Sequence, residues 1–207
     1  MRSRSARAGL LAALLGACQV ASAGEPEVRY PYRVEGVCPF ECCDFGTWTA
    51  RSDIPVFSAE RTRIAPAFTI RKGEEFEAVT GAWWALAPFI VKTKAAVEIP
   101  LATNLVPEAP DRAKLGHDWT TSETLSLPAG AQIHVLANLG EGAQVGLAAG
   151  RPVALDASLY DAPGSDYEIA KARPANATEW WIEVKSAGRS GWFERGKYEI
   201  DGSDRCE

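Results

Sequence analysis

The sequence contains few of the residues from which enzymes most often build active sites. It has only two histidines, His117 and His134, and neither lies in an H-E-x-x-H motif or in an H-x-E motif with C-x-x-C. His117 precedes Asp118, but sequence neighbours rarely form a catalytic dyad, and no nucleophile elbow accompanies them. We interpret His117 as a loop residue and predict that the protein is not an enzyme.

Metal-binding patterns are also missing. The N-terminal cysteines are spaced C-x3-C-C, without the C-x-x-C pair or the nearby histidine of a zinc site. The acidic pair Asp201 and Asp204 lacks the longer acidic loop of an EF-hand, and no two carboxylates are placed as a glycosidase requires. The sequence therefore predicts no metal and no cofactor.

The one long apolar run lies at the N-terminus. Arg2, Arg4 and Arg7 precede an uncharged run over residues 8–17, and small residues follow at 21–23. This order is typical of a secretory signal cleaved after Ala23, and the run is too short to span a bilayer, which takes roughly 20 residues. The sequence predicts export to the periplasm or the medium, where disulfides persist.

A second cleavage site is also present in this segment. Residues 15–18, Leu-Gly-Ala-Cys, resemble the lipobox of bacterial lipoproteins, in which a lipid is attached to the cysteine. On this alternative Cys18 would anchor an outer-membrane lipoprotein, and membrane contact would be through the lipid alone.

Charge narrows the class of partner. The chain has 22 basic and 27 acidic residues, a formal net charge of −5. Without residues 1–23, which hold three arginines, the balance is 19 against 27, or −8. Phosphate binding depends on clustered lysine and arginine, so we do not expect a nucleic-acid partner.

Four cysteines follow the signal: Cys38, Cys42, Cys43 and Cys206. An even number in an exported chain predicts two structural disulfides. Adjacent Cys42 and Cys43 would close a strained ring, so one N-terminal cysteine is expected to pair with Cys206. Which one pairs is left open by the sequence.

Short runs of β-branched and aromatic residues, separated by glycine and proline, predict an all-β fold without a long helix. The expected strands cover residues 54–57, 67–70, 75–80, 131–139, 143–147, 151–155, 180–184 and 190–193.

Two segments resemble bacterial SH3-like (SH3b) domains. Residues 54–79, with Lys72-Gly73 between two strands, are similar to the opening half of that family. Residues 180–193, with a glycine turn and Gly191-Trp192, resemble its closing hairpin, and residues 127–142 resemble a degenerate further copy of the central part. The resemblance covers about half of the mature chain and implies small SH3-like β-barrels.

The spacing of these pieces leaves two arrangements open, because the opening half and the closing hairpin lie far apart in sequence. The chain forms either two tandem barrels or one barrel interrupted by a second, and we favour two units with the last hairpin packed near the first. The expected parts are a Cys-rich segment at 24–47, a first unit at 48–99, a linker at 100–118, a degenerate second unit at 119–160, and a closing hairpin with a cysteine tail at 161–207.

The resemblance implies recognition rather than catalysis. Exported SH3-like domains are often attached to cell-wall enzymes and are thought to bind peptidoglycan or short peptides. Our preferred hypothesis is a non-catalytic binding module of the bacterial cell envelope that recognises cell-wall material or peptide. The alternatives are a disulfide-stapled protein that binds or inhibits an envelope protein, and a small envelope hydrolase.

The tryptophans supply the candidate contacts. The chain has seven, including the adjacent pairs Trp83-Trp84 and Trp180-Trp181. Neighbours in a strand point to opposite faces, so one ring of each pair can face outward and stack on a ligand. We predict Trp84 and Trp181 as the outward rings, with Tyr30 and Tyr32 as further contacts. The alternative is that these rings cover a hairpin or pack against a neighbouring unit.

Overall fold

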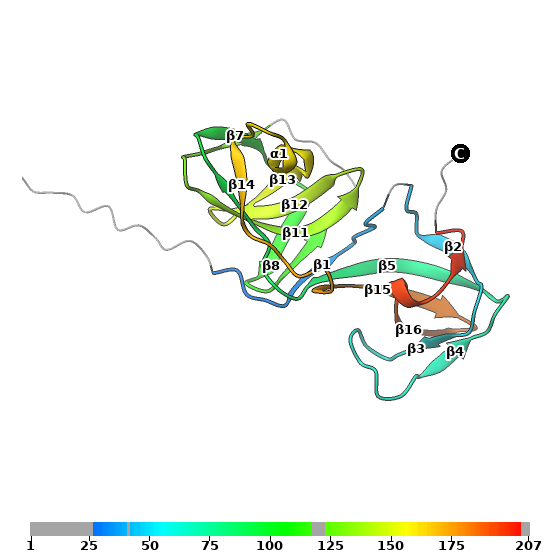
Figure 1. Ribbon diagram of the computed structural model, residues 1–207. Coiled ribbons are helices and arrows are strands. Elements are labelled where there is room, and N and C mark those ends of the chain that lie inside the picture. Colours follow the sequence, from blue (N-terminus) through cyan, green and yellow to red (C-terminus); the bar gives the residue numbers. More distant parts are fainter. Residues whose placement is uncertain (1–26, 41, 117–122, 204–207) are drawn as a thin grey trace, which may run out of the picture.

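Alternation of apolar and polar residues along short segments produces a structure that is nearly all strand. The computed structural model describes residues 27–40, 42–116 and 123–203, with 55% of these described residues in strands and 4% in helices (Figure 1). The predicted all-β fold is confirmed. The signal segment, Cys18, His117 and Cys206 lie outside the described residues. None of the described helices is long and apolar enough to cross a membrane.

Figure 1 shows two lobes, with β5 and β15 running from the junction into the first lobe. The first lobe pairs strands in the order β17-β2-β5-β15-β16, with the hairpin β3–β4 beside them. Its strands are β2 (Gly46–Ala50), β3 (Ile54–Val56), β4 (Phe68–Ile70), β5 (Glu75–Ala85), β15 (Thr178–Ser186), β16 (Arg189–Glu194) and β17 (Ile200–Asp201). The 3-10 helix η1 (Arg195–Lys197) lies between the last two.

The central pair of this lobe joins distant parts of the chain. The antiparallel register of β5 with β15 runs from Thr178 opposite Ala85 to Lys185 opposite Glu77, with an irregularity after Glu183. Residues 86–177 therefore lie between two paired strands of the same sheet. The side chains that point inward form the first core, and the largest of its fully buried members are Trp48, Ile54, Ile70, Ile182 and Phe193.

The second lobe is built from these inserted residues. Its main sheet has the order β13-β12-β11-β6-β14, and a two-stranded sheet of β7 and β10 lies against it through the bridge from Leu101 to Val153. The elements are β6 (Ile90–Thr93), β7 (Val97–Pro100), β10 (Thr124–Leu127), β11 (Gln132–Gly140), β12 (Ala143–Ala148), β13 (Arg151–Asp156), α1 (Ser158–Asp161) and β14 (Tyr167–Lys171).

A further core joins the lobes. Strand β1 (Tyr32–Glu35) pairs with β5 and β9 (Arg112–Leu115), and β8 (Leu105–Ala109) forms the outer edge. Tyr32 and Val34 of β1 belong to one buried cluster with Leu136 and Val145 of the second lobe. This shared apolar cluster holds the two lobes against each other.

The segment 100–118, predicted to be a linker, contains β8 and β9 instead. Three prolines suggested a loop, but Pro107 lies in β8, which is the outermost strand of its sheet. A proline is tolerated on an edge strand because the outward side of that strand needs no N–H donor.

Candidate functional site

Of the four residues predicted to contact a ligand, two are fully buried and two are half-buried. Trp181 and Tyr32 are 0% exposed, whereas Trp84 and Tyr30 are half-buried. Trp181 and Tyr32 are therefore not outward-facing contacts, and the prediction for them is corrected. Tyr32 belongs to the core between the lobes, while Trp181 lies in a central strand with neighbours on both edges.

Residues 57–67, which we call the covering loop, lie over the face of β5 and β15 that carries Trp84 and Trp181. The guanidinium of Arg61 is 4.9 Å from the centre of the Trp84 ring, and that of Arg63 is 5.5 Å from Trp181. Phe57 meets Trp181 edge-to-face with a centroid distance of 6.3 Å. The ring faces that were predicted to stack on a ligand are occupied by side chains of this loop.

Ion pairs hold the covering loop in place. Glu60 accepts hydrogen bonds from Trp84 Nε1 at 2.6 Å and from Arg33, also at 2.6 Å. Across the same face, Glu179 accepts from Arg63 at 2.9 Å and from Trp181 Nε1 at 3.0 Å. Both carboxylates are nearly buried, with 12% and 11% of their side chains exposed. Buried carboxylates with several donors support a structural role for this network rather than a site open to a ligand.

The Glu179 carboxylate makes stability depend on pH. Burial alone would raise the pKa of Glu179, but hydrogen bonds from Trp181 and Arg63 and the charges of Arg63 and Arg61 outweigh it and lower the pKa. A lowered folded-state pKa stabilises the protein above the unfolded value, about 4.3, and this contribution is lost as pH falls. We expect this contribution to the free energy of unfolding to be complete above about pH 5 and to be lost as the pH falls from there through the lowered folded-state pKa.

Urea unfolding at a series of pH values measures this effect. Glu179→Gln should show a shallower decline towards low pH than the unaltered protein. Glu168→Gln, at an exposed position on β14, is the control and should keep the original slope. Equal slopes for all three proteins would contradict the role given to Glu179.

A hollow with different chemistry lies on the other face of β5 and β15. It has a volume of about 400 Å³, and we call it the tryptophan groove. Its lining residues are Phe40, Trp83, Thr178, Glu179, Trp180, Glu194, Arg195 and Gly196. This volume falls within the range of small-ligand sites.

Strand register places the two tryptophans of the groove. Trp83 and Trp180 are directly opposite partners in the β5–β15 pair, so both rings are on the same face. Trp180 is 9% exposed and Trp83 is half-buried. Phe40 approaches Trp180 edge-to-face at a centroid distance of 5.5 Å. Three aromatic rings thus come together at the groove.

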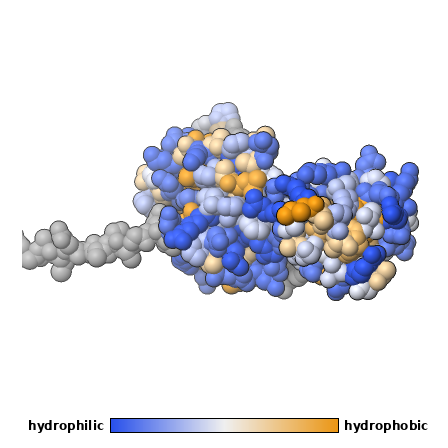
Figure 2. Space-filling model, turned by 90° about the horizontal axis from the view of Figure 1, so that it is seen from below, coloured by the Kyte–Doolittle hydropathy of each residue, from blue (hydrophilic) through white to orange (hydrophobic). Residues whose placement is uncertain are grey.

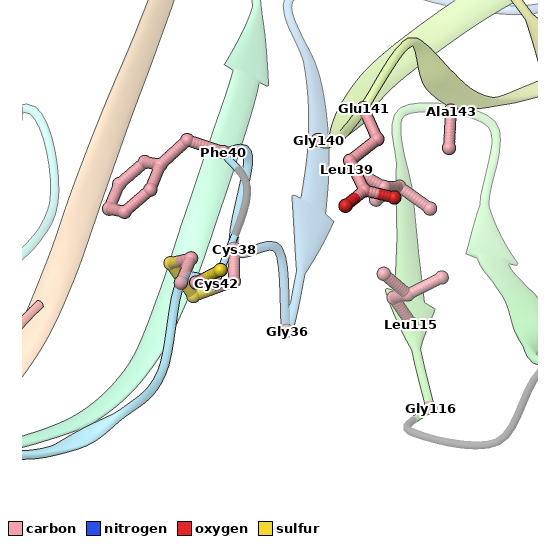
Figure 3. Close-up of a pocket in the computed structure, with 11 residues that line it drawn as sticks. Gly36, Cys38, Phe40, Cys42, Leu115, Gly116, Leu139, Gly140, Glu141 and Ala143 are labelled. Carbon is pink, nitrogen blue, oxygen red and sulfur yellow. A yellow bond between two sulfur atoms is a disulfide. The ribbon is translucent and has the colours of Figure 1, made fainter. Parts of the chain in front are cut away.

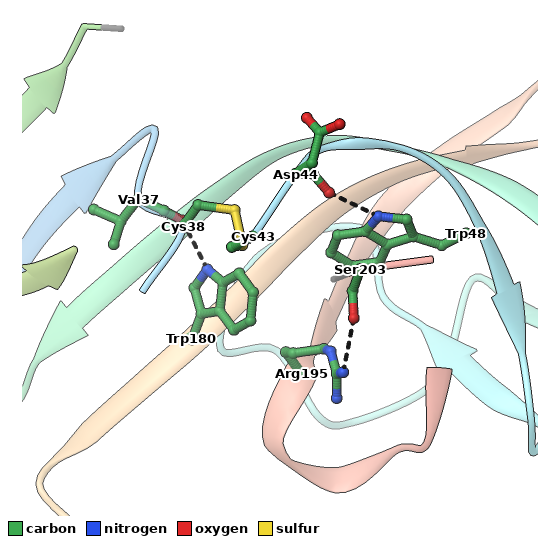
Figure 4. The surroundings of a disulfide bond; sticks show 8 residues. All are labelled: Val37, Cys38, Cys43, Asp44, Trp48, Trp180, Arg195 and Ser203. Atoms are coloured by element: carbon green, nitrogen blue, oxygen red, sulfur yellow. Dashed lines mark hydrogen bonds between the residues drawn. A yellow bond between two sulfur atoms is a disulfide. The ribbon is translucent and has the colours of Figure 1, made fainter. Parts of the chain in front are cut away.

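The Cys-rich segment forms one wall of the groove. A disulfide joins Cys38 to Cys43 (Figure 4). It closes the loop that carries Phe40. Just before this loop, the carbonyl of Val37 accepts a hydrogen bond from Trp180 Nε1 at 3.0 Å. Cys42 is also disulfide-bonded, and the predicted pairing with Cys206 falls outside the described residues.

Two donors at the groove lack acceptors. Trp83 Nε1 and Arg195 Nε are buried without a hydrogen-bond partner. The other nitrogens of Arg195 donate to the carbonyl of Tyr198 at 2.9 Å and to Ser203 Oγ at 3.2 Å. Burial lowers the pKa of Arg195. The groove therefore combines an apolar aromatic surface with unused donors and a cation.

A neighbouring hollow of about 390 Å³ separates the disulfide loop from the turn between β11 and β12 (Figure 3). Phe40 lines both hollows. The second hollow is lined mainly by cysteine, leucine and glycine, without a tryptophan or a cation among its described residues. It lacks the unpartnered donors of the tryptophan groove.

Figure 2 shows one face of the molecule, where hydrophobic and hydrophilic residues are interspersed over both lobes.

Tyr30 and His134 contact each other at the junction of the lobes. Their Oη and Nδ1 atoms are 3.2 Å apart, and burial raises the pKa of Tyr30 to about 12. We assign Tyr30 a structural contact rather than a place in the groove.

Within the described ranges, no group of three or more His, Cys, Asp or Glu side chains could hold a metal ion.

Sequence reasoning missed Phe40, Trp83 and Arg195. It did single out the Trp83-Trp84 pair, but it chose the ring that the covering loop occupies. The choice depends on which face of β5 meets the groove, and this follows from pairing with β15, about 100 residues later.

Comparisons with protein-family models, with curated proteins and with solved structures found no match to this chain.

Proposed function

We propose that the protein is an exported, non-catalytic binding module of the bacterial cell envelope that recognises peptidoglycan through the tryptophan groove. The observation that carries this proposal is the grouping of Trp83, Trp180 and Phe40 around one hollow with unused hydrogen-bond donors. Aromatic rings with nearby polar groups bind sugars and peptides by stacking and directed hydrogen bonds.

We further propose that the first lobe is an SH3-like barrel interrupted by the second lobe. The pairing of the closing hairpin β15–β16 with β5 supports this proposal, as does the return of β17 to pair with β2. The strands thereby surround one core, as the resemblance implies, with residues 86–177 inserted between β5 and β15. The degenerate second SH3-like unit and its boundaries stay a prediction.

Export and location are proposed from the signal segment. The Cys38–Cys43 disulfide supports an oxidising compartment, such as the periplasm or the medium. The alternative proposal is an outer-membrane lipoprotein anchored through Cys18, a residue outside the described part of the chain.

Sedimentation with purified peptidoglycan sacculi tests the proposed function. We expect the oxidised, exported form of the full chain to co-sediment with sacculi at both low and moderate salt. Trp83→Ala should weaken binding about tenfold, because it removes an aromatic anchor at the groove. Trp192→Ala, at a partly exposed position that does not line the groove, is the matched control and should bind normally.

Circular dichroism would check that each variant is folded. Absence of sedimentation, or equal loss in the Trp83 and Trp192 variants, would contradict the assignment of the groove. A pull-down that captured an envelope protein while sacculi failed to bind would favour the alternative of a protein partner.

A further inference from the structure

Arg195 is the cation that lines the tryptophan groove. The cations on the covering-loop side of the sheet have acidic partners: Arg61 and Arg63 pair with Glu179, and Lys197 pairs with Glu194 at 2.7 Å. Among the described residues, no carboxylate lies within ion-pair distance of Arg195, whose two terminal nitrogens donate to a carbonyl and a hydroxyl. A part-buried guanidinium that has no counter-charge among the described residues favours an anionic ligand.

Trp83 supplies a second unused donor at the same hollow. The indole N–H groups of Trp48 and Trp180 each reach a backbone carbonyl, and that of Trp84 reaches Glu60. Trp83 Nε1 is buried without an acceptor. Since buried donors in folded proteins nearly always have partners, each unpartnered one requires an explanation. A ligand oxygen would supply the missing acceptor.

The glutamates that border the groove are neutralised on the other face of the sheet. Glu194 is the register partner of Trp181, so its side chain and that of Glu179 lie on the covering-loop side, where they pair with Arg61, Arg63 and Lys197. Among the charged residues that line the groove, Arg195 is therefore the one without an ion pair to another described residue.

We propose that the tryptophan groove binds the carboxylate of a short peptide, with Arg195 as its counter-charge and Trp83 Nε1 as a second donor. The rings of Phe40 and Trp180 would hold the apolar part of that peptide. This inference rests on the proposed function and narrows the ligand to the stem peptides of peptidoglycan rather than its glycan strands. Both donor atoms are shielded from water, so binding includes a side-chain shift at the groove wall.

Stem peptides released from sacculi by an amidase are the direct probe. Their affinity is measured by isothermal titration, beside the same peptides with every carboxyl group converted to an amide. Hydrogen bonds to charged groups are worth roughly tenfold to a hundredfold in affinity, so the amidated peptides should bind at least about tenfold more weakly.

Three variants separate ligand contact from folding. Trp83→Phe removes a donor that has no acceptor in the protein, so it should weaken peptide binding several-fold while the melting temperature changes little. Arg195→Gln should weaken binding about tenfold or more, and Trp192→Phe, away from the groove, should leave it unchanged. Thermal melting followed by circular dichroism checks that all three are folded.

Equal affinity for free and amidated peptides would overturn the inference, and so would unchanged binding in both Trp83→Phe and Arg195→Gln. Sedimentation with intact and amidated sacculi distinguishes failure of the carboxylate inference from failure of the proposed binding to the cell wall. Equal binding to both would overturn the carboxylate and leave the wall-binding function standing. Absence of binding to sacculi and to peptides would overturn both.

Discussion

Trp181→Ala is expected to lower the free energy of unfolding by about 3–5 kcal/mol, the range measured when a large buried aromatic ring is truncated. The Trp181 side chain is fully buried in a central strand, with Phe57 at its edge and Arg63 over its face. Its N–H also donates to Glu179. Truncation would leave a cavity beneath the covering loop and remove one donor from a nearly buried carboxylate.

Urea unfolding gives the loss directly. Trp192→Ala, on the adjacent strand β16, removes the same side chain from a partly exposed position and should cost less than half as much. If the two substitutions lowered the free energy of unfolding equally, this would contradict the full burial of Trp181 under the covering loop. The sequence-based prediction that Trp181 contacts a ligand leads to a different expectation for Trp181→Ala, namely weaker ligand binding with little change in stability.

Gly81→Ala is expected to cost about 2–3 kcal/mol, because a methyl group at this position has no room. An ideal Cβ would be 2.5 Å from Trp180 Nε1 and closer still to the carbonyl of Val37. These two groups form the hydrogen bond that positions Trp180 at the groove. The substitution should therefore weaken both folding and binding to sacculi, since relief of the clash separates Trp180 from Val37.

Gly196→Ala is the matched control. No atom lies within 4 Å of an ideal Cβ at Gly196, and this residue also lines the groove. We expect its free energy of unfolding to change by no more than about 0.5 kcal/mol. Similar stability of the two alanine variants would show that Val37 and Trp180 do not pack closely on Gly81.

Local patterns predicted the strands well. In β5, Phe76 and Ala78 alternate with exposed glutamates, and the two residues are buried on one face as the period-two pattern indicates. The glycine turn at 186–188 joins β15 to β16, as expected for a hairpin. These features depend on residues close in sequence, so a single chain carries enough information to predict them.

The candidate site depended on pairing that local patterns do not contain. Alternation indicates that Trp83 and Trp84 face opposite ways, but it does not say which face the covering loop will occupy. That loop is held by ion pairs from Arg61 and Arg63 to Glu179, more than 100 residues away. The groove likewise depends on Phe40, which a disulfide loop brings to Trp180. No local signal distinguishes these residues from ordinary core and surface positions.

Nuclear magnetic resonance of the indole N–H groups tests the central claim most directly, because each tryptophan gives its own signal. Soluble fragments of peptidoglycan would be titrated into the 15N-labelled protein. The account predicts that the Trp83 signal shifts most, and that the signals of Trp48 and Trp84, which already have acceptors, change little. A spectrum in which Trp83 stays unmoved while Trp84 or Trp192 shifts would contradict the assignment of the groove as the binding site.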